Sequence, residues 1–192
     1  MKCKSSIPLS EIKKRLKGKS EKQLISLVSG CYKLSDEVKF YLSTKLMENE
    51  QEGQRIIEEL KDELYYAFWR ERGNEPIIPD LKRAKKVISD LKIITNNPEI
   101  IISFMLGYID HGISFSCKYG DMCEKYYNSI EKMFESMTKI ILENSKQINI
   151  YQTVGRIEEI VDKSSAFGWG VYDNLSDWTE ELKEDLGIET DD

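Results

Sequence analysis

Apolar residues recur every three or four positions along almost the whole chain, which is the spacing of one face of an α-helix. The first such stripe begins at Leu9 and the last reaches Leu182. No window of useful length shows the two-residue alternation of a half-buried strand. The pattern therefore predicts an all-α protein with about eight or nine helices and no sheet. The short helical connections favour a multi-helix bundle or stacked antiparallel helical hairpins.

Side chains that cap helices stand at four of the expected helix starts. These are Ser20 with Gln23, Ser35 before two acids, Asn97 before Pro98 and Glu99, and Asp121 with Glu124. The first and last pairs have the spacing of a capping box, in which two side chains satisfy backbone N–H groups reciprocally. Near the end of the chain, Ser164 or Ser165 is expected to cap the last helix.

The stretch from Arg70 to Pro79 is the strongest interruption of the helical pattern. It contains Gly73, Pro76 and Pro79, and proline breaks a helix because it lacks the backbone N–H. We therefore expect an N-terminal helical region over residues 1–70, a Gly/Pro linker over 71–79 and a C-terminal helical bundle over 80–192. One continuous domain is the alternative.

Two glycines bracket a tryptophan in the segment AFGWGVYD, residues 166–173. A phosphate-binding loop would follow a strand and carry a further glycine or a Gly-Lys-Ser/Thr sequence, and this segment has neither. Glycine within a helix costs about 0.5–1 kcal/mol relative to alanine, so a compensating contact is expected. We expect Gly168 and Gly170 to lie in the opening turns of the last helix and to let a neighbouring helix approach closely.

The net charge of −6 is distributed unevenly along the chain. Residues 1–47 contain eleven Lys/Arg and four Asp/Glu, whereas the tail from Asp173 onward contains nine acids and one lysine. The candidate anion or nucleic-acid surface is the basic run of Lys13, Lys14, Arg15 and Lys17. Charges of this kind are more often an ordinary solvated helix face, and no helix-turn-helix pattern accompanies them.

The four cysteines, Cys3, Cys31, Cys117 and Cys123, form no C-x-x-C pair, and the chain has a single histidine. This pattern lacks the ligand spacing of a metal site, so no metal and no cofactor are expected. Reduced thiols and the absence of a secretory signal favour a cytoplasmic protein. The most apolar run, 100–109, is about half the length that spans a bilayer, so we expect a buried helix and no membrane association.

Polar and aromatic residues are densest around the single histidine. The candidate pocket is formed by Asp110, His111, Tyr119 and Asp121, with Trp169, Tyr172 and Asp173 as expected spatial neighbours. A histidine beside carboxylates can serve in acid–base chemistry or bind a small ligand. However, Asp110 and His111 point to different faces of one helix, which favours a structural role for each. No catalytic residue is assigned.

Four segments resemble an uncharacterised family of short bacterial all-helical proteins, catalogued as a domain of unknown function. They read LSEIKKRLKGKSEKQLISLV, LKRAKKVISDLK, HGISFSCKYGDMCEKYYNSIEKMFE and IVDKSSAFGWGVYDNL, and they cover most of the chain. The most specific parts are the aromatic-Tyr-Gly-Asp segment near Phe115 and the Gly-Trp-Gly segment. The resemblance implies a helical fold and a bacterial origin, and it implies no activity, cofactor or catalytic residue. The acidic tail after Trp178 lies outside the pattern.

These observations favour a non-catalytic cytoplasmic protein-interaction module. Its expected partner is another protein, and the opposite charges of the two chain ends favour weak homo-oligomerisation as well. Two alternatives remain open. One is a helical enzyme or small-ligand binder that uses a pocket near His111. The other is a nucleic-acid-associated protein that uses the basic N-terminal helix.

Overall fold

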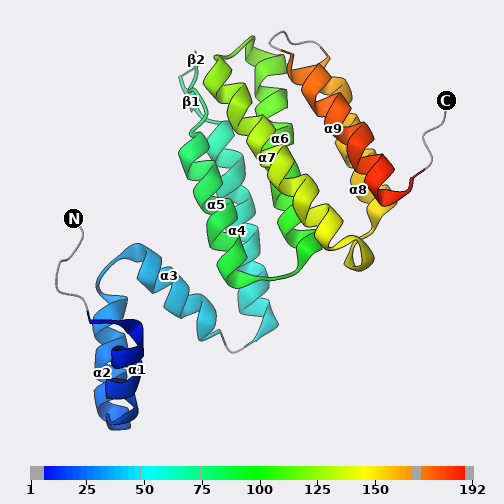
Figure 1. Ribbon diagram of the computed structural model, residues 1–192. Helices are drawn as coiled ribbons and strands as arrows, with labels where there is room; N and C mark the ends of the chain where they lie inside the picture. The colour runs from blue at the N-terminus through cyan, green and yellow to red at the C-terminus, as the bar shows by residue number, and fades with distance from the viewer. Residues whose placement is uncertain (1–6, 48, 74, 166–169, 189–192) are drawn as a thin grey trace. The chain divides into compact units, whose positions relative to one another are not determined.

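The computed structural model describes residues 7–47, 49–73, 75–165 and 170–188, and these residues are almost entirely α-helical (Figure 1). The described helices are α1 (Leu9–Lys17), α2 (Glu21–Tyr32), α3 (Asp36–Lys45), α4 (Glu50–Phe68), α5 (Leu81–Ile94), α6 (Pro98–Tyr119), α7 (Glu124–Glu143), α8 (Ile150–Ser164) and α9 (Val171–Leu186). A short 3-10 turn, η1 (Ser145–Gln147), precedes α8. The all-α class and the expected helix number are confirmed.

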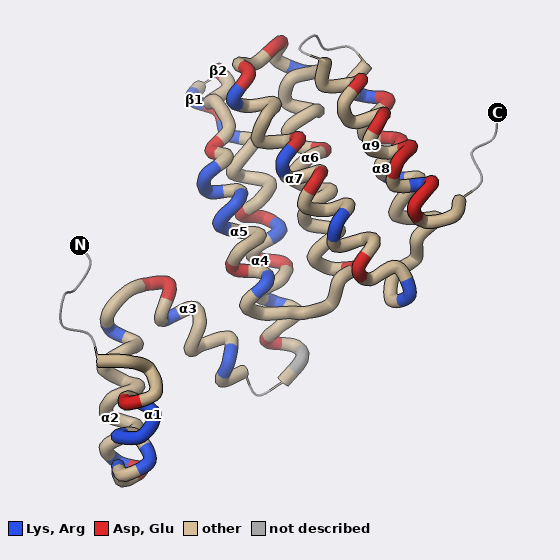
Figure 2. Tube along the Cα trace, in the orientation of Figure 1, with Lys and Arg blue, Asp and Glu red and all other residues tan. Residues whose placement is uncertain are grey.

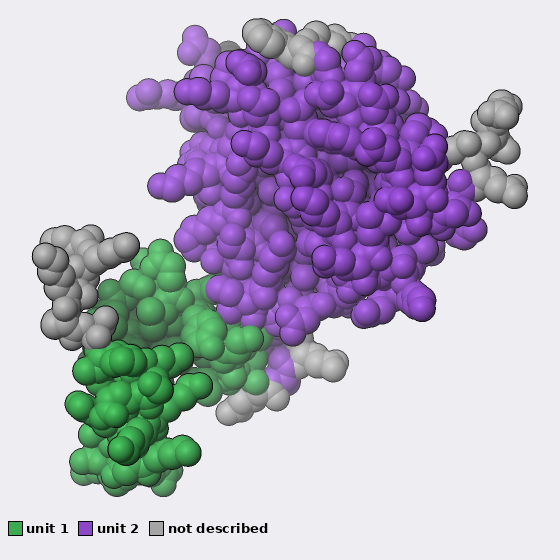
Figure 3. Space-filling model, in the orientation of Figure 1, with its two compact units in different colours: residues 1–48 green, residues 49–192 purple. Residues whose placement is uncertain are grey.

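The chain forms two compact units, Met1–Glu48 and Asn49–Asp192, which we call the N-terminal and the C-terminal unit (Figure 3). The division therefore lies ahead of α4 and not at the expected linker 71–79. That segment forms a small hairpin inside the C-terminal unit, in which β1 (Glu71–Arg72) pairs antiparallel with β2 (Glu75–Pro76). Gly73 allows the turn because its φ of 68° lies in the left-handed region. These two-residue strands are the exception to the expectation of no sheet.

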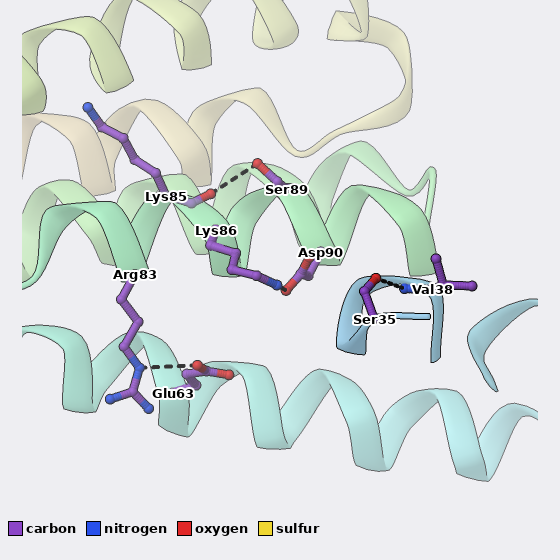
Figure 4. Close-up of polar contacts among 8 residues, drawn as sticks. All are labelled: Ser35, Val38, Glu63, Arg83, Lys85, Lys86, Ser89 and Asp90. Atoms are coloured by element: carbon purple, nitrogen blue, oxygen red, sulfur yellow. Dashed lines mark hydrogen bonds and ion pairs between the residues drawn. The ribbon is translucent and has the colours of Figure 1, made fainter. Parts of the chain in front are cut away.

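The C-terminal unit is built from three helical hairpins that lie side by side, α4–α5, α6–α7 and α8–α9 (Figure 1). α6 is the central helix, because it packs against α4, α5, α7 and α8. An ion pair between Arg83 Nε and Glu63 Oε1, 3.1 Å apart, joins α5 to α4 (Figure 4). This arrangement corresponds to the stacked antiparallel hairpins that the short connections predicted.

α6 contains the most apolar run of the chain, and more than half of its residues are buried. By length and composition, α6 is the one described helix that could cross a membrane, but 61% of its most apolar window is buried among the other helices. That burial is what we expect of the core helix of a helical bundle. The prediction of a buried helix over this run is confirmed.

Two tyrosine hydroxyls that are buried between α6 and α7 have hydrogen-bond partners. The hydroxyls of Tyr108 and Ser129 lie 2.7 Å apart, and the Tyr126 hydroxyl donates to the carbonyl of Gly112 at 2.9 Å. Burial raises the pKa of Tyr108 to about 12 and also raises the pKa of Tyr126. Both phenols therefore stay neutral and serve as hydrogen-bonding groups inside the core.

Three of the first four predicted caps are confirmed. Ser20 and Gln23 form the reciprocal capping box at α2, Ser35 accepts from Val38 N at α3, and Asn97 accepts from Glu99 N at α6 (Figure 4 shows the Ser35 cap). The fourth prediction is wrong. α7 begins at Glu124, so its cap position is Cys123, and Asp121 instead accepts hydrogen bonds from Met122 N and the Tyr127 hydroxyl.

The expected role of the glycines near Trp169 is not supported where the structure describes them. Gly170 is the residue before α9, has a φ of 67°, and has no atom within 4 Å of an added Cβ. Glycine at this position allows a left-handed turn, and it does not make room for a neighbouring helix. Ser164 and Ser165 bond back to carbonyls of α8 and do not cap α9. Gly168 and Trp169 lie outside the described residues.

Close helix contact occurs instead at Gly112 on α6. A Cβ at this position would lie 2.7 Å from Ile130 Cδ1 and 3.0 Å from Ile130 Cγ1 on α7. Since real Cβ atoms do not approach so closely, only glycine fits without movement of the neighbouring helix or side chain. Gly112 stands inside an uninterrupted helix, where the cost of glycine itself indicates a compensating contact, but the sequence does not show which helix makes that contact.

Candidate functional site

His111 is half-buried on α6 and packs against the end of α4. The Trp69 indole N–H donates to His111 Nδ1 at 3.2 Å, and the ring centroids of Tyr65 and Phe68 lie 5.7 and 5.8 Å from that of the imidazole. Because Nδ1 accepts this bond, the neutral ring carries its proton on Nε2. Burial lowers the pKa of His111; Asp110 opposes that shift and Lys163 adds to it. The imidazole is therefore neutral near pH 7.

Asp110 turns toward α8 and not toward the imidazole. Lys163 Nζ donates to Asp110 Oδ1 at 2.8 Å, and the Ser114 hydroxyl donates to the same oxygen at 3.3 Å. The carboxylate is thus held by an ion pair between α6 and α8. The side chains of Asp110 and His111 point in different directions, because successive positions lie on different faces of a helix. They therefore form no carboxylate–imidazole pair for proton transfer.

Tyr119 belongs to an aromatic cluster centred on Trp69. Its ring lies 4.8 Å from Phe115 and 6.4 Å from Trp69, and its hydroxyl donates to Glu71 at 3.3 Å. Lys118 Nζ lies 4.9 Å from the Tyr119 ring centroid. This cluster connects the end of α6 to α4 and to the β1–β2 hairpin, and Trp69 links Tyr119 to His111.

The other expected members of the pocket lie elsewhere. Asp121 is exposed in the α6–α7 connection and bonds to Tyr127. Tyr172 and Asp173 are exposed on the first turn of α9, on a helix that packs against α7 and α8. Trp169 lies outside the described residues. The structure therefore brings together Asp110, His111 and, through Trp69, Tyr119.

A groove follows α6 between α4 and α8, and we call it the α6 groove. Its volume is about 570 Å³, and its lining includes Asp110 and His111 at one end and Glu99 at the other. α4 contributes Lys61 and Leu64 to its wall, and α8 contributes Arg156. Sequence analysis missed this groove, because it depends on three helices that are far apart in the chain.

The N-terminal unit is the second candidate site, and its described residues bury no apolar side chain. Thr44 is the one residue there that is buried. Ten large apolar side chains are exposed: Ile7, Leu9, Ile12, Ile25, Leu27, Val28, Tyr32, Leu34, Tyr41 and Leu46. We call this set the N-terminal apolar surface. No comparable set is exposed among the described residues of the C-terminal unit.

The basic residues expected to form an anion surface are all exposed on α1. Arg15 pairs with Glu11 at 2.8 Å, whereas Lys13, Lys14 and Lys17 have no ion pair with any residue that the structure describes. Figure 2 shows basic positions along α1, in contrast to the largely acidic α9. The N-terminal unit therefore combines exposed apolar side chains with a positive charge.

Among the residues placed by the structure, no three His, Cys, Asp or Glu side chains gather in a way that could hold a metal ion. Comparisons of the chain with protein-family models, with curated proteins and with solved structures gave no match. The chemistry of the described residues is therefore the guide to the function of this chain.

Proposed function

We propose that this protein is a non-catalytic protein-interaction module whose N-terminal unit docks onto an acidic partner protein. The observation that carries the proposal is the N-terminal apolar surface, because this unit exposes ten large apolar side chains and its described residues bury none. Exposed apolar area of this kind is typical of interaction sites.

The energy available from covering this surface is similar in size to the cost of association. Leu9, Ile25, Leu34 and Leu46 are each more than half exposed. Full burial of such a side chain contributes about 1.5–3 kcal/mol, so covering these four contributes at most about 6–12 kcal/mol. The loss of translational and rotational freedom on association offsets about 4–15 kcal/mol of this gain. A partner must therefore cover most of the surface to bind stably.

Charge selects the kind of partner. Residues 1–47 carry eleven basic and four acidic side chains, so two copies of the N-terminal unit repel each other. An acidic partner is attracted, and it must also offer apolar side chains. The acidic helix α9 of a second copy meets the first condition but fits the second poorly, since its residues Val171, Leu175 and Leu182 are already buried. We therefore favour a different protein over self-association.

The test compares proteins captured by the full-length chain and by two double variants. The first variant, Leu34→Ser with Leu46→Ser, removes side chains that are 76% and 68% exposed in the N-terminal unit. The control, Ile78→Ser with Tyr151→Ser, removes side chains that are 71% and 77% exposed in the C-terminal unit. Because all four are exposed, both variants are expected to keep the wild-type far-ultraviolet circular dichroism.

The proposal predicts an acidic protein that the wild type and the control retain and the first variant loses. Direct binding of the purified pair should also weaken as salt is raised, since opposite charges are screened. If both variants capture the same proteins as the wild type, the N-terminal apolar surface is not the docking site. If light scattering instead shows salt-sensitive oligomers of the chain alone, self-association replaces a foreign partner.

A further inference from the structure

A second groove lies between α7 and α9, which pack against each other, and we call it the α7–α9 groove. Its volume of about 540 Å³ is in the range of ligand sites. Leu142 of α7 and Trp178 of α9 are half-buried in its lining, so its wall is partly apolar. The Trp178 indole stacks on the buried Phe134 ring, with the centroids 6.0 Å apart. This packing holds the exposed part of the indole in place beside the groove.

The charged side chains in the lining of the α7–α9 groove leave it negative. Glu135 and Lys139 of α7 neutralise each other, because Lys139 Nζ lies 2.7 Å from Glu135 Oε1. The carboxylates of Glu181 and Asp185 on α9 form no ion pair or hydrogen bond with any residue that the structure describes. The groove therefore carries two uncompensated negative charges beside an aromatic ring.

The two groove carboxylates belong to a longer row of acids, which we call the acidic stripe. Four acids follow one another at intervals of four along α9: Asp173, Asp177, Glu181 and Asp185 (Figure 2). Like charges at this spacing are neighbours on the helix surface and destabilise a helix by about 0.2–0.5 kcal/mol per pair. The single lysine of α9, Lys183, does not offset them, since it pairs with Glu158 and Glu180 at 3.0 Å. A bound positive charge would remove this repulsion.

The length and the aromatic ring of this surface indicate the kind of positive charge that it fits. From Asp173 to Asp185 the acidic stripe extends over about 18 Å of helix, so a small cation would meet only part of it. Trp178 and Glu181 are three positions apart and are therefore neighbours on the helix surface. A guanidinium can stack on an aromatic ring and also pair with a carboxylate through two N–H···O bonds. One arginine side chain can therefore use both residues.

From this arrangement we infer that the α7–α9 groove docks an arginine-rich segment of a partner protein, with one guanidinium stacked on Trp178 and paired with Glu181. Asp185 and the rest of the acidic stripe attract the other basic side chains of that segment. This surface lies wholly within the C-terminal unit, and its charge is opposite to that of the N-terminal unit. The inference therefore does not rest on the proposed docking of an acidic partner.

The experiment titrates the full-length chain into a fluorescein-labelled peptide of alternating arginine and alanine, long enough to follow the acidic stripe. Fluorescence anisotropy measures binding, and two comparison peptides carry lysine or glutamate in place of arginine. We expect the arginine peptide to bind with a dissociation constant below about 100 μM at an ionic strength of about 0.15 M. The lysine peptide should bind at least about twofold more weakly, because an ammonium lacks the planar fork, and the glutamate peptide should not bind. Equal binding of either comparison peptide would overturn the inference, and so would no binding of the arginine peptide.

Two double variants locate the peptide on the molecule. Glu181→Gln with Asp185→Asn removes the groove carboxylates and should weaken binding about fivefold or more. Asp62→Asn with Glu159→Gln is the matched control, because these exposed acids on α4 and α8 have no ion pair within the described ranges. The control should bind as the wild type does, and both variants should keep the wild-type circular dichroism. If the control loses as much affinity as the first variant, general charge attraction holds the peptide and the inference is wrong.

Two further variants test the indole and the independence of the two surfaces. Trp178→Leu keeps an apolar side chain beside Phe134 and should weaken binding of the arginine peptide about two- to fivefold, whereas an unchanged affinity would contradict the stacking on Trp178. Leu34→Ser with Leu46→Ser should leave the affinity unchanged, which separates this surface from the N-terminal apolar surface. If light scattering shows oligomers of the chain alone that the variant without the groove carboxylates no longer forms, the groove holds a second copy of the chain and a foreign partner is wrong.

Discussion

Gly112→Ala is the substitution whose outcome the packing of α6 and α7 determines most directly. Alanine is favoured over glycine in a helix by about 0.5–1 kcal/mol, which by itself would stabilise the protein. The added methyl group, however, would lie 2.7 Å from Ile130 Cδ1 and 3.0 Å from Ile130 Cγ1. Ile130 is fully buried and β-branched, so it has little freedom to move away.

Overpacking of a core costs about 1–3 kcal/mol, which exceeds the gain in helix propensity. We expect Gly112→Ala to lower the free energy of unfolding by about 0.5–2 kcal/mol. Gly155→Ala on α8 is the matched control, because no atom lies within 4 Å of its added Cβ. That control should raise the free energy of unfolding by about 0.5–1 kcal/mol.

A double-mutant cycle identifies the cause. Ile130→Val removes Cδ1, the atom nearest to the new methyl group, at a cost of about 0.5–1.5 kcal/mol. Valine keeps Cγ1, which would lie 3.0 Å from the new methyl group, so Gly112→Ala should cost less in the Ile130→Val background than in the wild type, which makes the two substitutions non-additive. Urea denaturation of the full chain, followed by circular dichroism, measures all four proteins. The reasoning is refuted if Gly112→Ala stabilises the wild type as much as Gly155→Ala does.

Three further outcomes are expected. The pKa of His111 is lowered from 6.5, so the unfolded chain takes up the proton first as pH decreases. The stability that depends on the neutral imidazole is therefore fully present above pH 6.5 and is lost below it. The free energy of unfolding should decrease there by at most about 1.4 kcal/mol per pH unit. His111→Asn keeps an acceptor for Trp69 and should flatten this decline in urea titrations between pH 7.5 and 5. Tyr108→Phe leaves the buried Ser129 hydroxyl unpaired and should cost about 1–3 kcal/mol, whereas adding Ser129→Ala should restore part of the loss. Changing the four basic residues of α1 to glutamate should abolish any salt-sensitive binding of a duplex DNA oligonucleotide; a fluorescence-anisotropy titration that is unchanged removes α1 as a nucleic-acid surface.

Local features of the fold were readable from the sequence because they depend on neighbouring residues. The helical period and the caps at Ser20, Ser35 and Asn97 involve contacts within a few positions, and each was confirmed. The same reasoning failed at Asp121, because the cap position of α7 is Cys123, two residues further along the chain. A Tyr127 hydroxyl within reach gave the carboxylate a different partner, and α7 began later.

The functional candidates depended much more on tertiary structure. The indole that orients His111 comes from Trp69, which is 42 positions away, and no local pattern connects the two. The α6 groove exists because α4 and α8 flank Ser103 and Gly107. The sequence shows that these two residues are small, but it does not show which helices lie beside them. Likewise, the apolar residues of the N-terminal unit have the spacing of a buried face, and their exposure is visible only in three dimensions.

The amino-acid sequence by itself determined that this chain is helical, where most of its helices begin, and how its charge is divided between the two ends. These properties follow from dihedral preferences, capping bonds and composition, all of which act over short distances along the chain. Which glycine admits a neighbouring helix, and which apolar face stays uncovered, was decided by packing. Those outcomes follow from the three-dimensional placement of side chains that are distant in sequence, and here Gly112 against Ile130 is the clearest instance.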